Sequence, residues 1–150
     1  MTDCYINWMS LVVSIVAFFF SLLSYYNSFM YEKRKATIEA YNHLQVFLHF
    51  FYEYQKDEIE DFVNDKHSDE YKVLSECLAQ IEFFATGIIN KAYDFRIAYQ
   101  MAHGFLDLTL RSRIDYMLAM KNESTTEHFY YNTEKLLQMM DRKSKRKIRK

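Results

Sequence analysis

The chain has 150 residues, a net charge of −1, no Pro, two Gly and two Cys. Because β-sheet folds depend on turns rich in Gly and Pro, this composition argues against an all-β fold and predicts long helices joined by short polar links. Two cysteines are too few for a disulfide framework, and Cys77 lies in an apolar pattern that predicts burial. The last ten residues hold seven Lys or Arg and one Asp, a net of +6, so the preceding 140 residues carry −7. We therefore expect an all-α protein with an acidic body and a strongly basic tail.

The segment over residues 8–30 is predominantly apolar, and no charged residue occurs between Asn7 and Tyr31. At about 1.5 Å per residue, such a helix exceeds the roughly 30 Å of a bilayer's hydrocarbon core. Ten Leu, Val, Ile or Phe residues within 11–23 together favour insertion by about 3 to 6 kcal/mol. A cleaved signal peptide is the alternative, but it requires a basic start, and residues 1–7 contain no Lys or Arg. The sequence predicts one transmembrane helix over 8–30.

Charged residues beside this segment predict its orientation. Lys33, Arg34 and Lys35 follow the apolar run directly, whereas an acidic residue precedes it. Positively charged flanks stay on the cytoplasmic side of a membrane. We therefore expect residues 1–7 outside the cell and residues 31–140 inside, with the helix crossing the inner (plasma) membrane.

Small residues recur along the predicted transmembrane helix at intervals of four, three, four, three and four positions. These residues, which we call the serine seam, are Ser10, Ser14, Ala17, Ser21, Ser24 and Ser28. At about 100° per residue they lie within roughly 80° of one another. In lipid, such a seam lets helices approach closely, and its heptad spacing favours a left-handed pair or bundle. We expect it to pair with a second copy or with a partner membrane protein; alternatively, the serines only bond back to their own backbone.

Residues 31–140 are predicted to form a small cytosolic bundle of about four helices, because apolar residues continue to recur with a helical period. The four are expected to run from Tyr31 to about Tyr54, from Ser68 to about Asn90, from Asp94 to about Lys121 and from Ser124 to about Met140. No Gly or Pro separates the first from the transmembrane helix, and the sequence leaves open whether the two form one unbroken helix. A short acidic segment over 57–64 and a polar turn over 64–69 separate the first two.

Local signals support these boundaries. Ser68 and Asp94 are candidate N-caps, and residues 124–127 (STTE) form a candidate capping box. The apolar stripe of the third helix includes Leu108. Gly104 lies in the middle of the same helix, where it costs about 1 kcal/mol relative to Ala, and this predicts the close approach of a neighbouring helix.

Three sequence segments follow the span in a fixed order. A basic flank with a Thr, residues 33–37 (KRKAT), comes first; an apolar run, residues 81–89 (IEFFATGII), comes next; the pair 93–94 (YD) then opens a helix. In this order, and over nearly its whole length, the chain resembles the bacterial single-span membrane proteins grouped as domain of unknown function 4760. The resemblance implies a bacterial or prophage membrane protein with a cytosolic helical domain. That family has no established activity, so no catalytic residue carries over.

The sequence contains no Gly-rich phosphate loop and no Gly-x-Ser-x-Gly, His-Glu-x-x-His or Cys-x-x-Cys motif. The nearest candidates for metal ligands are two pairs four residues apart, His49 with Glu53 and His103 with Asp107, with Glu82 as a third ligand to the second pair. Such pairs can share a metal ion or equally form ordinary surface hydrogen bonds, and the site with Glu82 is disfavoured. We expect no catalytic residue, no metal and no cofactor.

Cationic residues are the other candidates for binding. Arg96, Arg111 and Arg113 could hold a phosphate or an acidic partner, although pairs with nearby acids are favoured. The tail forms a denser patch of Arg142, Lys143, Lys145, Arg146, Lys147, Arg149 and Lys150. We expect residues 141–150 to be too charged to pack and to contact anionic membrane lipid, where each basic residue contributes about 1 kcal/mol. Nucleic acid is a less favoured ligand, and a merely solvated tail is the alternative.

These features favour a non-enzymatic, membrane-anchored helical interaction module that self-associates or binds a partner membrane protein. No small-molecule substrate is evident. The first alternative is an effector that assembles through the serine seam and perturbs the membrane, as in phage exclusion or defence. The second is a metal-dependent enzyme that uses His103, Asp107 and Glu82.

Overall fold

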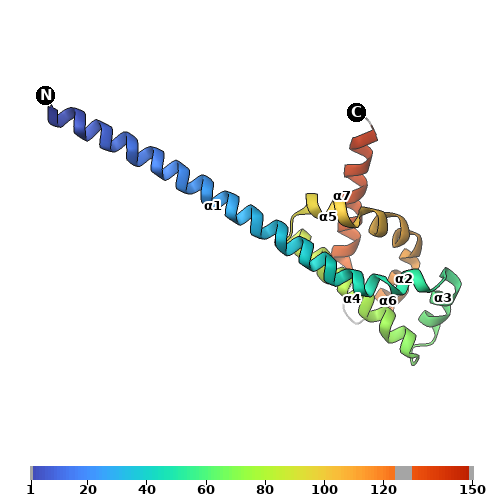
Figure 1. Cartoon of the computed structure of the whole chain (residues 1–150). Coiled ribbons are helices and arrows are strands. Elements are labelled where there is room, and N and C mark those ends of the chain that lie inside the picture. The colour runs from blue at the N-terminus through green and yellow to red at the C-terminus, as the bar shows by residue number, and fades with distance from the viewer. Residues whose placement is uncertain (1, 124–129, 149–150) are drawn as a thin grey trace.

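The computed structural model describes residues 2–123 and 130–148, and within these ranges the chain forms helices joined by short turns, without a strand. The longest helix, α1, runs from Thr2 to Leu48 and contains neither Gly nor Pro. Its N-terminal half extends alone, whereas its C-terminal half packs into a helical domain (Figure 1). The predicted all-α class is confirmed, and the apolar segment continues into the first helix of the domain without a break.

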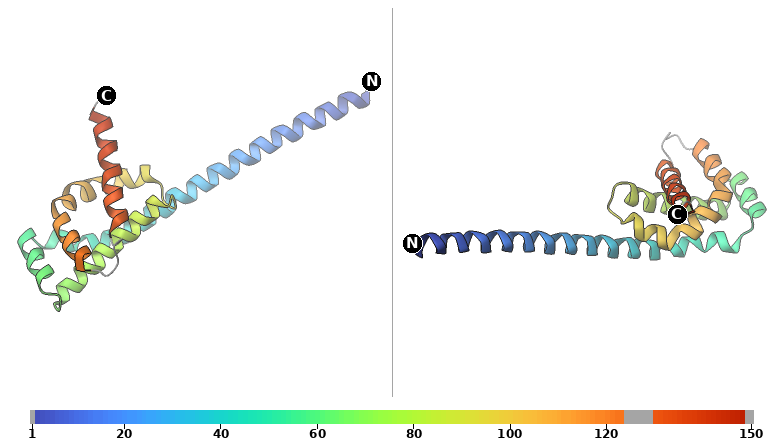
Figure 2. Two further views of the ribbon diagram at one scale, coloured as in Figure 1. Left: turned by 180° about the vertical axis from the view of Figure 1, so that it is seen from behind. Right: turned by 90° about the horizontal axis from the view of Figure 1, so that it is seen from above.

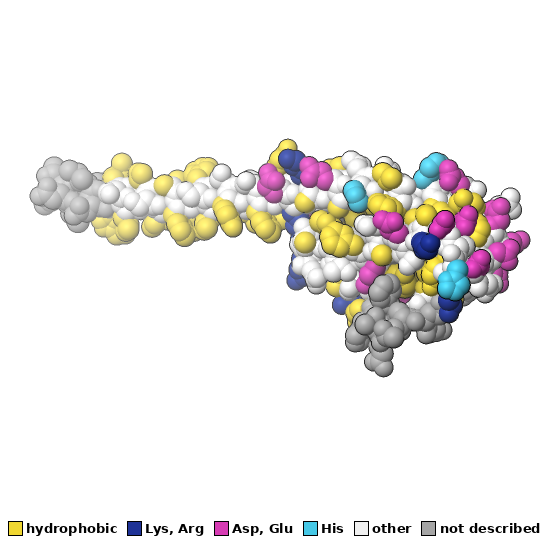
Figure 3. All heavy atoms as spheres, turned by 90° about the horizontal axis from the view of Figure 1, so that it is seen from below, with side chains coloured by type: hydrophobic (Ala, Val, Ile, Leu, Met, Phe, Trp, Pro, Cys, Tyr) yellow, Lys and Arg dark blue, Asp and Glu magenta, His cyan; other side chains and the backbone are white. Residues whose placement is uncertain are grey.

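The N-terminal half of α1 packs against nothing else in the described chain. Each residue from 8 to 29 is exposed, and an apolar 18-residue window with a mean hydropathy of 2.0 is 0% buried. Figure 3 shows apolar side chains along this half and charged side chains where α1 enters the domain. Among the described residues, one helix is long and apolar enough to cross a membrane, judged by length and composition alone, and it is this one.

The domain is divided into shorter helices than the predicted bundle of about four. They are α2 (Phe50–Glu53), α3 (Lys56–Asn64), α4 (Asp69–Ile89), α5 (Phe95–His103), α6 (Ile114–Glu123) and α7 (Tyr131–Ile148). A π-helical stretch, Gly104–Thr109, and a 3-10 turn, Arg111–Arg113, connect α5 to α6. The single helix predicted from Asp94 to about Lys121 is therefore interrupted by two irregular segments.

The π-helical stretch changes which residues face the core. Leu108 belongs to the predicted apolar stripe, yet 71% of this residue is exposed, and Leu110 is fully buried instead. Because a π turn holds more residues than an α turn, it rotates the positions that follow it around the helix axis. Gly104 begins this stretch, and a Cβ placed there would meet nothing within 4 Å, so the close helix approach predicted at Gly104 is wrong.

α4 forms the centre of the core and contacts both α1 and α7. Its buried face follows the predicted stripe and consists of Leu74, Cys77, Leu78, Ile81, Phe84, Ala85 and Ile88. Leu44 from α1 and Leu136 and Met140 from α7 are also almost completely buried. Burial disfavours the thiolate and raises the pKa of Cys77 to about 11, which makes this cysteine a small apolar core residue as predicted. Seen from behind, α7 crosses α4 steeply (Figure 2).

Two predicted N-caps are confirmed. The Ser68 hydroxyl accepts a hydrogen bond of 3.0 Å from the backbone N–H three residues later, at the start of α4. Asp94 accepts hydrogen bonds of 2.7 and 3.4 Å from the backbone N–H groups of Arg96 and Ile97, at the start of α5. These acceptors satisfy donors that have no partner inside the first helical turn. The capping box predicted over 124–127 lies outside the described residues.

The prediction that the tail does not pack is wrong for residues 141–144. α7 continues to Ile148, and Asp141 accepts a hydrogen bond of 2.8 Å from Arg111. This hydrogen bond also lowers the pKa of Asp141. Ser144 lies 3.2 Å from the Tyr99 hydroxyl on α5. The basic residues are tolerated because one face of the helix still packs, whereas long cationic side chains can extend from the other.

Candidate functional site

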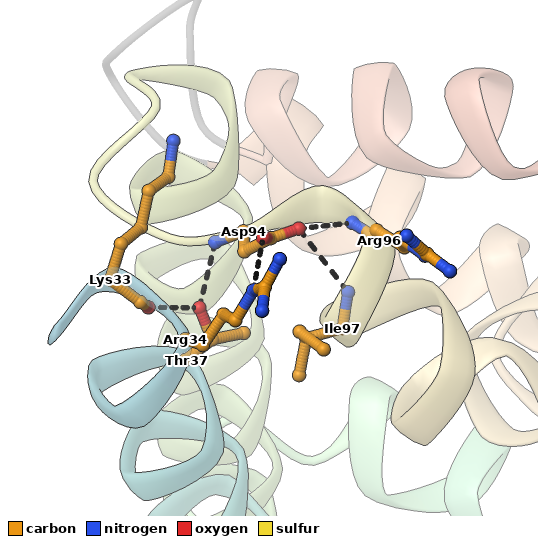
Figure 4. Close-up of polar contacts among 6 residues, drawn as sticks. All are labelled: Lys33, Arg34, Thr37, Asp94, Arg96 and Ile97. Carbon is orange, nitrogen blue, oxygen red and sulfur yellow. Dashed lines mark hydrogen bonds and ion pairs between the residues drawn. The ribbon is translucent and has the colours of Figure 1, made fainter. Parts of the chain in front are cut away.

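The end of the domain that receives α1 brings together residues from distant parts of the chain, and we call this cluster the basic junction. It consists of Arg34 and Thr37 on α1, Asp94 and Arg96 at the start of α5, and Lys143 on α7. Figure 4 shows Asp94 between α1 and α5, with Arg34 directed toward it. The side chain of Arg96 extends away on the other side of Asp94 (Figure 4).

Thr37 is fully buried, and its hydroxyl joins α1 to the start of α5. The Oγ1 atom donates a hydrogen bond of 2.7 Å to the Lys33 carbonyl and accepts one of 2.7 Å from the Asp94 N–H. A buried N–H left without an acceptor costs about 1–3 kcal/mol, so the hydroxyl has a structural role beyond its own helix. This contact fixes the start of α5 against α1 across 57 positions of sequence.

The Asp94 carboxylate serves both helices. Its Oδ1 atom caps α5, and its Oδ2 atom lies 3.7 Å from Nε of Arg34. The Arg34 side chain is 52% exposed, whereas that of Asp94 is only 12% exposed. Because ion pairs with a solvent-exposed partner contribute about 1 kcal/mol or less, Arg34 adds little to the stability of the fold. Its guanidinium group is therefore available to solvent and to a ligand.

Lys143 brings a third cation into the basic junction from α7. Its Nζ atom lies 4.2 Å from the centre of the Tyr99 ring and 5.0 Å from that of Phe95, within the range of cation–π contacts. Burial lowers the pKa of Lys143, the positive charge of Arg96 lowers it further, and the negative charge of Asp94 raises it. The basic junction thus holds three cationic side chains around one carboxylate.

An open pocket of about 210 Å³ lies between α1 and α5 within the basic junction. Its lining consists of Arg34, Arg96, Ile97 and Gln100. Two guanidinium groups and an amide are hydrogen-bond donors, and guanidinium groups match the geometry of phosphate and carboxylate oxygens. Chemically, this arrangement is suited to holding an anion.

The predicted topology flank of Lys33, Arg34 and Lys35 divides between the core and the surface. Arg34 belongs to the basic junction, whereas Lys33 is half-buried and contributes its backbone carbonyl to Thr37. Lys35 is exposed, 4.0 Å from Glu39 on the next turn of α1. All three therefore lie at the point where α1 changes from exposed to packed.

The three arginines considered as phosphate ligands are not brought together. Arg111 donates hydrogen bonds to Asp141 and to the Leu137 carbonyl, which secures α7 to the 3-10 turn. Arg113 donates a hydrogen bond of 2.8 Å to the Phe51 carbonyl. These two arginines hold the fold together, and Arg96 alone belongs to the basic junction.

The basic tail is described only in part. Arg142 and Lys145 are exposed on α7, and Lys143 lies in the basic junction. The remaining basic side chains predicted to bind lipid, Arg146, Lys147, Arg149 and Lys150, lie outside the part of the chain whose side chains are described. In Figure 1 the C-terminal end of α7 leaves the domain on the upper side, as does the exposed half of α1.

The residues proposed for a metal site are separated. Glu82 accepts hydrogen bonds from the backbone N–H groups of Asn132 and Thr133 at 3.0 and 2.8 Å, at the start of α7. His103 Nε2 lies 3.1 Å from Oγ of Ser144. Ser144 is about 16 Å further along α7 than Thr133, the partner of Glu82. Glu82 and His103 therefore do not converge, and no cluster of three or more His, Cys, Asp or Glu residues suited to a metal occurs among the described residues. The Asp107 side chain lies outside them.

The second metal-ligand pair is an exposed contact on the surface. His49 Nε2 lies 3.1 Å from Glu53, with 71% of the His49 side chain exposed. The pair connects the end of α1 to the short helix α2 as an i, i+4 contact, one of the two explanations that the sequence left open.

The serine seam lies entirely on the exposed half of α1, over residues 10–28. The Ser14 hydroxyl donates a hydrogen bond of 2.8 Å to the Ser10 carbonyl, and the Ser21 hydroxyl donates one of 2.9 Å to the Ala17 carbonyl. These two hydroxyls donate their hydrogen bonds to the backbone of their own helix, as in the alternative interpretation of the sequence. The side of the helix that they leave exposed is narrow and lined by small side chains.

The three segments that carry the resemblance to a known family meet around the basic junction. Residues 33–37 supply Thr37, residues 93–94 supply its partner, and residues 81–89 end beside them, where a Cβ on Gly87 would overlap the Tyr93 ring. The hydrogen bond of Thr37 and the position of Lys143 were not predicted from the sequence. No protein-family model matches the chain, and neither does any curated protein or solved structure.

Proposed function

We propose that the protein is a non-enzymatic interaction module anchored in the inner membrane by α1. The observation that carries this proposal is one continuous helix with two different environments. Its N-terminal half is apolar and 0% buried over the most apolar window, whereas Thr37, Leu44 and Leu48 in its C-terminal half are core residues. Lipid is the environment that covers such an exposed apolar surface, and the helix then holds the domain directly at the membrane face.

The charge distribution supports a cytoplasmic location for the domain. Figure 3 shows Lys and Arg side chains, with some Asp and Glu, where α1 enters the domain, whereas Asp and Glu side chains predominate at the opposite end. The acidic end includes α3, whose first turn carries Asp57 and Glu58. An anionic inner leaflet attracts the first surface and repels the second. This orientation also agrees with the bacterial single-span family that the sequence resembles, to which we propose the chain is related.

Anchoring and orientation are tested together by the accessibility of Cys4. We expect the full-length protein to resist extraction by alkaline carbonate. In intact cells, a membrane-impermeant maleimide should label Cys4 outside the membrane, and the Cys4→Ser variant should not be labelled because Cys77 is buried. Labelling only after lysis would reverse the orientation, and complete carbonate extraction would reject the anchor.

Self-association through the serine seam is the form of interaction that we propose for the membrane helix. The mass of the full-length protein in a mild detergent or nanodisc should correspond to a discrete oligomer. A triple variant with Ser14, Ala17 and Ser21 changed to Leu should be monomeric, because larger side chains keep the helices apart. The matched control changes Val12, Ile15 and Phe19 to Leu on the opposite side of the helix and should keep the oligomer. A monomeric native protein would reject self-association and leave a partner's membrane helix as the proposed contact.

A further inference from the structure

The basic junction is built from three helices but carries more positive charge than its one carboxylate balances. Arg34, Arg96 and Lys143 come from α1, α5 and α7, and Asp94 is the acid between them. Asp94 already accepts two backbone hydrogen bonds at the start of α5, so much of its capacity is used. An arrangement of like charges that gathers around a pocket is stabilised when an anion occupies it.

The pocket within this cluster has the donors that a phosphate group needs. Arg34 and Arg96 line it from two different helices, and Gln100 adds an amide. Arg34 is half exposed and is not needed for the fold, so its guanidinium group can reorient toward a ligand. Lys143 does not line the pocket, but its contacts with two aromatic rings hold it close enough to Arg96 for the two positive charges to interact.

The pocket also lies at a suitable height for a headgroup. Arg34 follows Met30, the last residue of the apolar segment, by four positions, or about 6 Å along the helix axis. Beyond the hydrocarbon core of a bilayer, this distance falls within the headgroup region. A pocket lined by Arg34 at this level of α1 is therefore within reach of lipid phosphates.

We propose that the basic junction is a binding pocket for a phosphate group, and that its ligand is the phosphate of an anionic lipid headgroup in the inner leaflet. This inference rests on the proposed anchoring of α1. It differs from the general attraction of a basic tail to a membrane, because it requires residues of α1 and α5 as well as one residue of α7. The pocket makes the domain sensitive to the headgroup composition around its anchor.

Native mass spectrometry of the full-length protein in a neutral detergent tests the proposal. We expect phosphatidylglycerol to occupy one saturable site with higher affinity than phosphatidylcholine of the same acyl chains. The double variant Arg96→Gln/Lys143→Gln should bind phosphatidylglycerol about thirty-fold more weakly, since each basic residue near an anionic headgroup contributes a factor of about five. The charge-preserving variant Arg96→Lys should keep most of the affinity, which separates charge from folding.

A matched control removes two positive charges at the other end of the domain. Lys56→Gln/Lys72→Gln lowers the net charge equally, and Lys72 lies about 25 Å along α4 from the end nearest the basic junction. This control should bind phosphatidylglycerol like the native chain. An equal loss of affinity in the control, or equal affinity for phosphatidylcholine, would overturn the proposal.

The source of the phosphate is distinguished by competition with inorganic phosphate and glycerol 1-phosphate. Weak competition at millimolar concentration supports a lipid, because the acyl chains then hold the headgroup at the pocket. Binding of inorganic phosphate as tightly as lipid, and its loss in Arg96→Gln/Lys143→Gln, would assign the same pocket to a soluble phosphate compound and reject the lipid. A chain that resists carbonate extraction but shows no headgroup preference would reject the pocket alone, whereas complete extraction would reject the anchor.

Discussion

At the residue scale, the missing side chain of Gly87 makes room for the ring that controls how the chain turns from α4 into α5. Gly87 lies under the ring of Tyr93, which also packs 5.8 Å from the ring of Phe84 in the core. Lys91, between them, adopts a left-handed conformation with φ of 62°, and the Tyr93 N–H donates a hydrogen bond of 3.0 Å to the Gly87 carbonyl. The turn delivers Asp94 to Thr37, so the shape of the basic junction depends on the space at position 87.

The two glycines should respond to Ala in opposite directions. Gly87→Ala places a methyl group in the Tyr93 ring, and such overpacking costs about 1–3 kcal/mol, more than the roughly 1 kcal/mol by which Ala favours a helix over Gly. Gly104→Ala meets nothing within 4 Å and has helical backbone angles, so only the helix propensity changes. In thermal unfolding of the full-length protein, Gly87→Ala should lower the Tm and Gly104→Ala should raise it, each by about 2–4 °C. Equal shifts in the two variants would contradict the role of Tyr93.

At the element scale, the start of α7 depends on a residue from another helix. The first N–H groups of a helix lack partners inside it, and a Ser, Thr, Asp or Asn before the helix normally accepts them. The residue before α7 is Tyr130, which is none of these residue types. The Glu82 carboxylate on α4 takes this role, accepting from the Asn132 and Thr133 N–H groups and, at 2.7 Å, from the Thr133 hydroxyl.

Removing this carboxylate should loosen α7 without disturbing α1. Glu82→Ala leaves two backbone donors and the buried Thr133 hydroxyl without their acceptor, and we expect the free energy of unfolding to fall by about 2–3 kcal/mol. Glu82→Gln keeps one acceptor oxygen and should lose less. Hydrogen exchange should become faster at Asn132 and Thr133 in the Ala variant, whereas exchange near Leu44 on α1 should change much less. Unchanged exchange at the start of α7 would contradict this role of Glu82.

The elements that the sequence predicts well are those determined by local pattern. The stripe of α4 and the N-caps Ser68 and Asp94 depend on neighbours within one or two turns, and they are confirmed. The π-helical stretch depends on where Leu110 fits in a core made by other helices, which no local period reveals. The packing of residues 141–144 is also non-local, because their charge predicts solvation and their partners, such as Arg111, lie far away in the sequence.

The candidate site shows the same division between local and distant information. The basic flank after the span was predicted from charge alone, and Arg34 belongs to the site. The link between Thr37 and Asp94 joins positions 57 apart, and Lys143 reaches the same region from the last helix. Glu82 was considered only as a third metal ligand beside His103 and Asp107, in an alternative that the sequence disfavours. In the structure Glu82 caps α7. This role could be predicted only with the knowledge that α7 begins beside Glu82.

At the scale of the whole molecule, α1 acts as a rigid arm that couples the exposed segment to the domain. No loop separates the two, since the helix continues from Thr2 to Leu48 and the Thr37 hydroxyl fixes its domain half to α5. A domain on a flexible linker samples many orientations at the membrane, whereas a domain on a continuous helix presents one face to it. With α1 anchored as proposed, the second case holds the basic junction at a fixed orientation to the lipid.

A helix break between the two halves should release this orientation. Tyr31 and Glu32 are both exposed, so changing both to Gly leaves the core intact while each Gly costs about 1 kcal/mol of helix stability. In a Cys4→Ser background, spin labels on Tyr26→Cys and Ala79→Cys should give one narrow distance distribution in nanodiscs. The Gly-Gly variant should broaden it.

The matched control for this experiment changes Lys66 and His67 to Gly in the turn before α4, where no helix is broken. The distribution should then stay narrow, because the turn lies away from the arm. Cys77 can remain in place, since burial raises its pKa to about 11 and keeps the thiol unreactive toward the label. A native distribution as broad as that of the Gly-Gly variant would mean that the domain is not held in one orientation. A pocket shared by α1 and α5 could still select a headgroup without a fixed orientation of the domain. The domain could not, however, present its outer surface to a partner in one regular orientation.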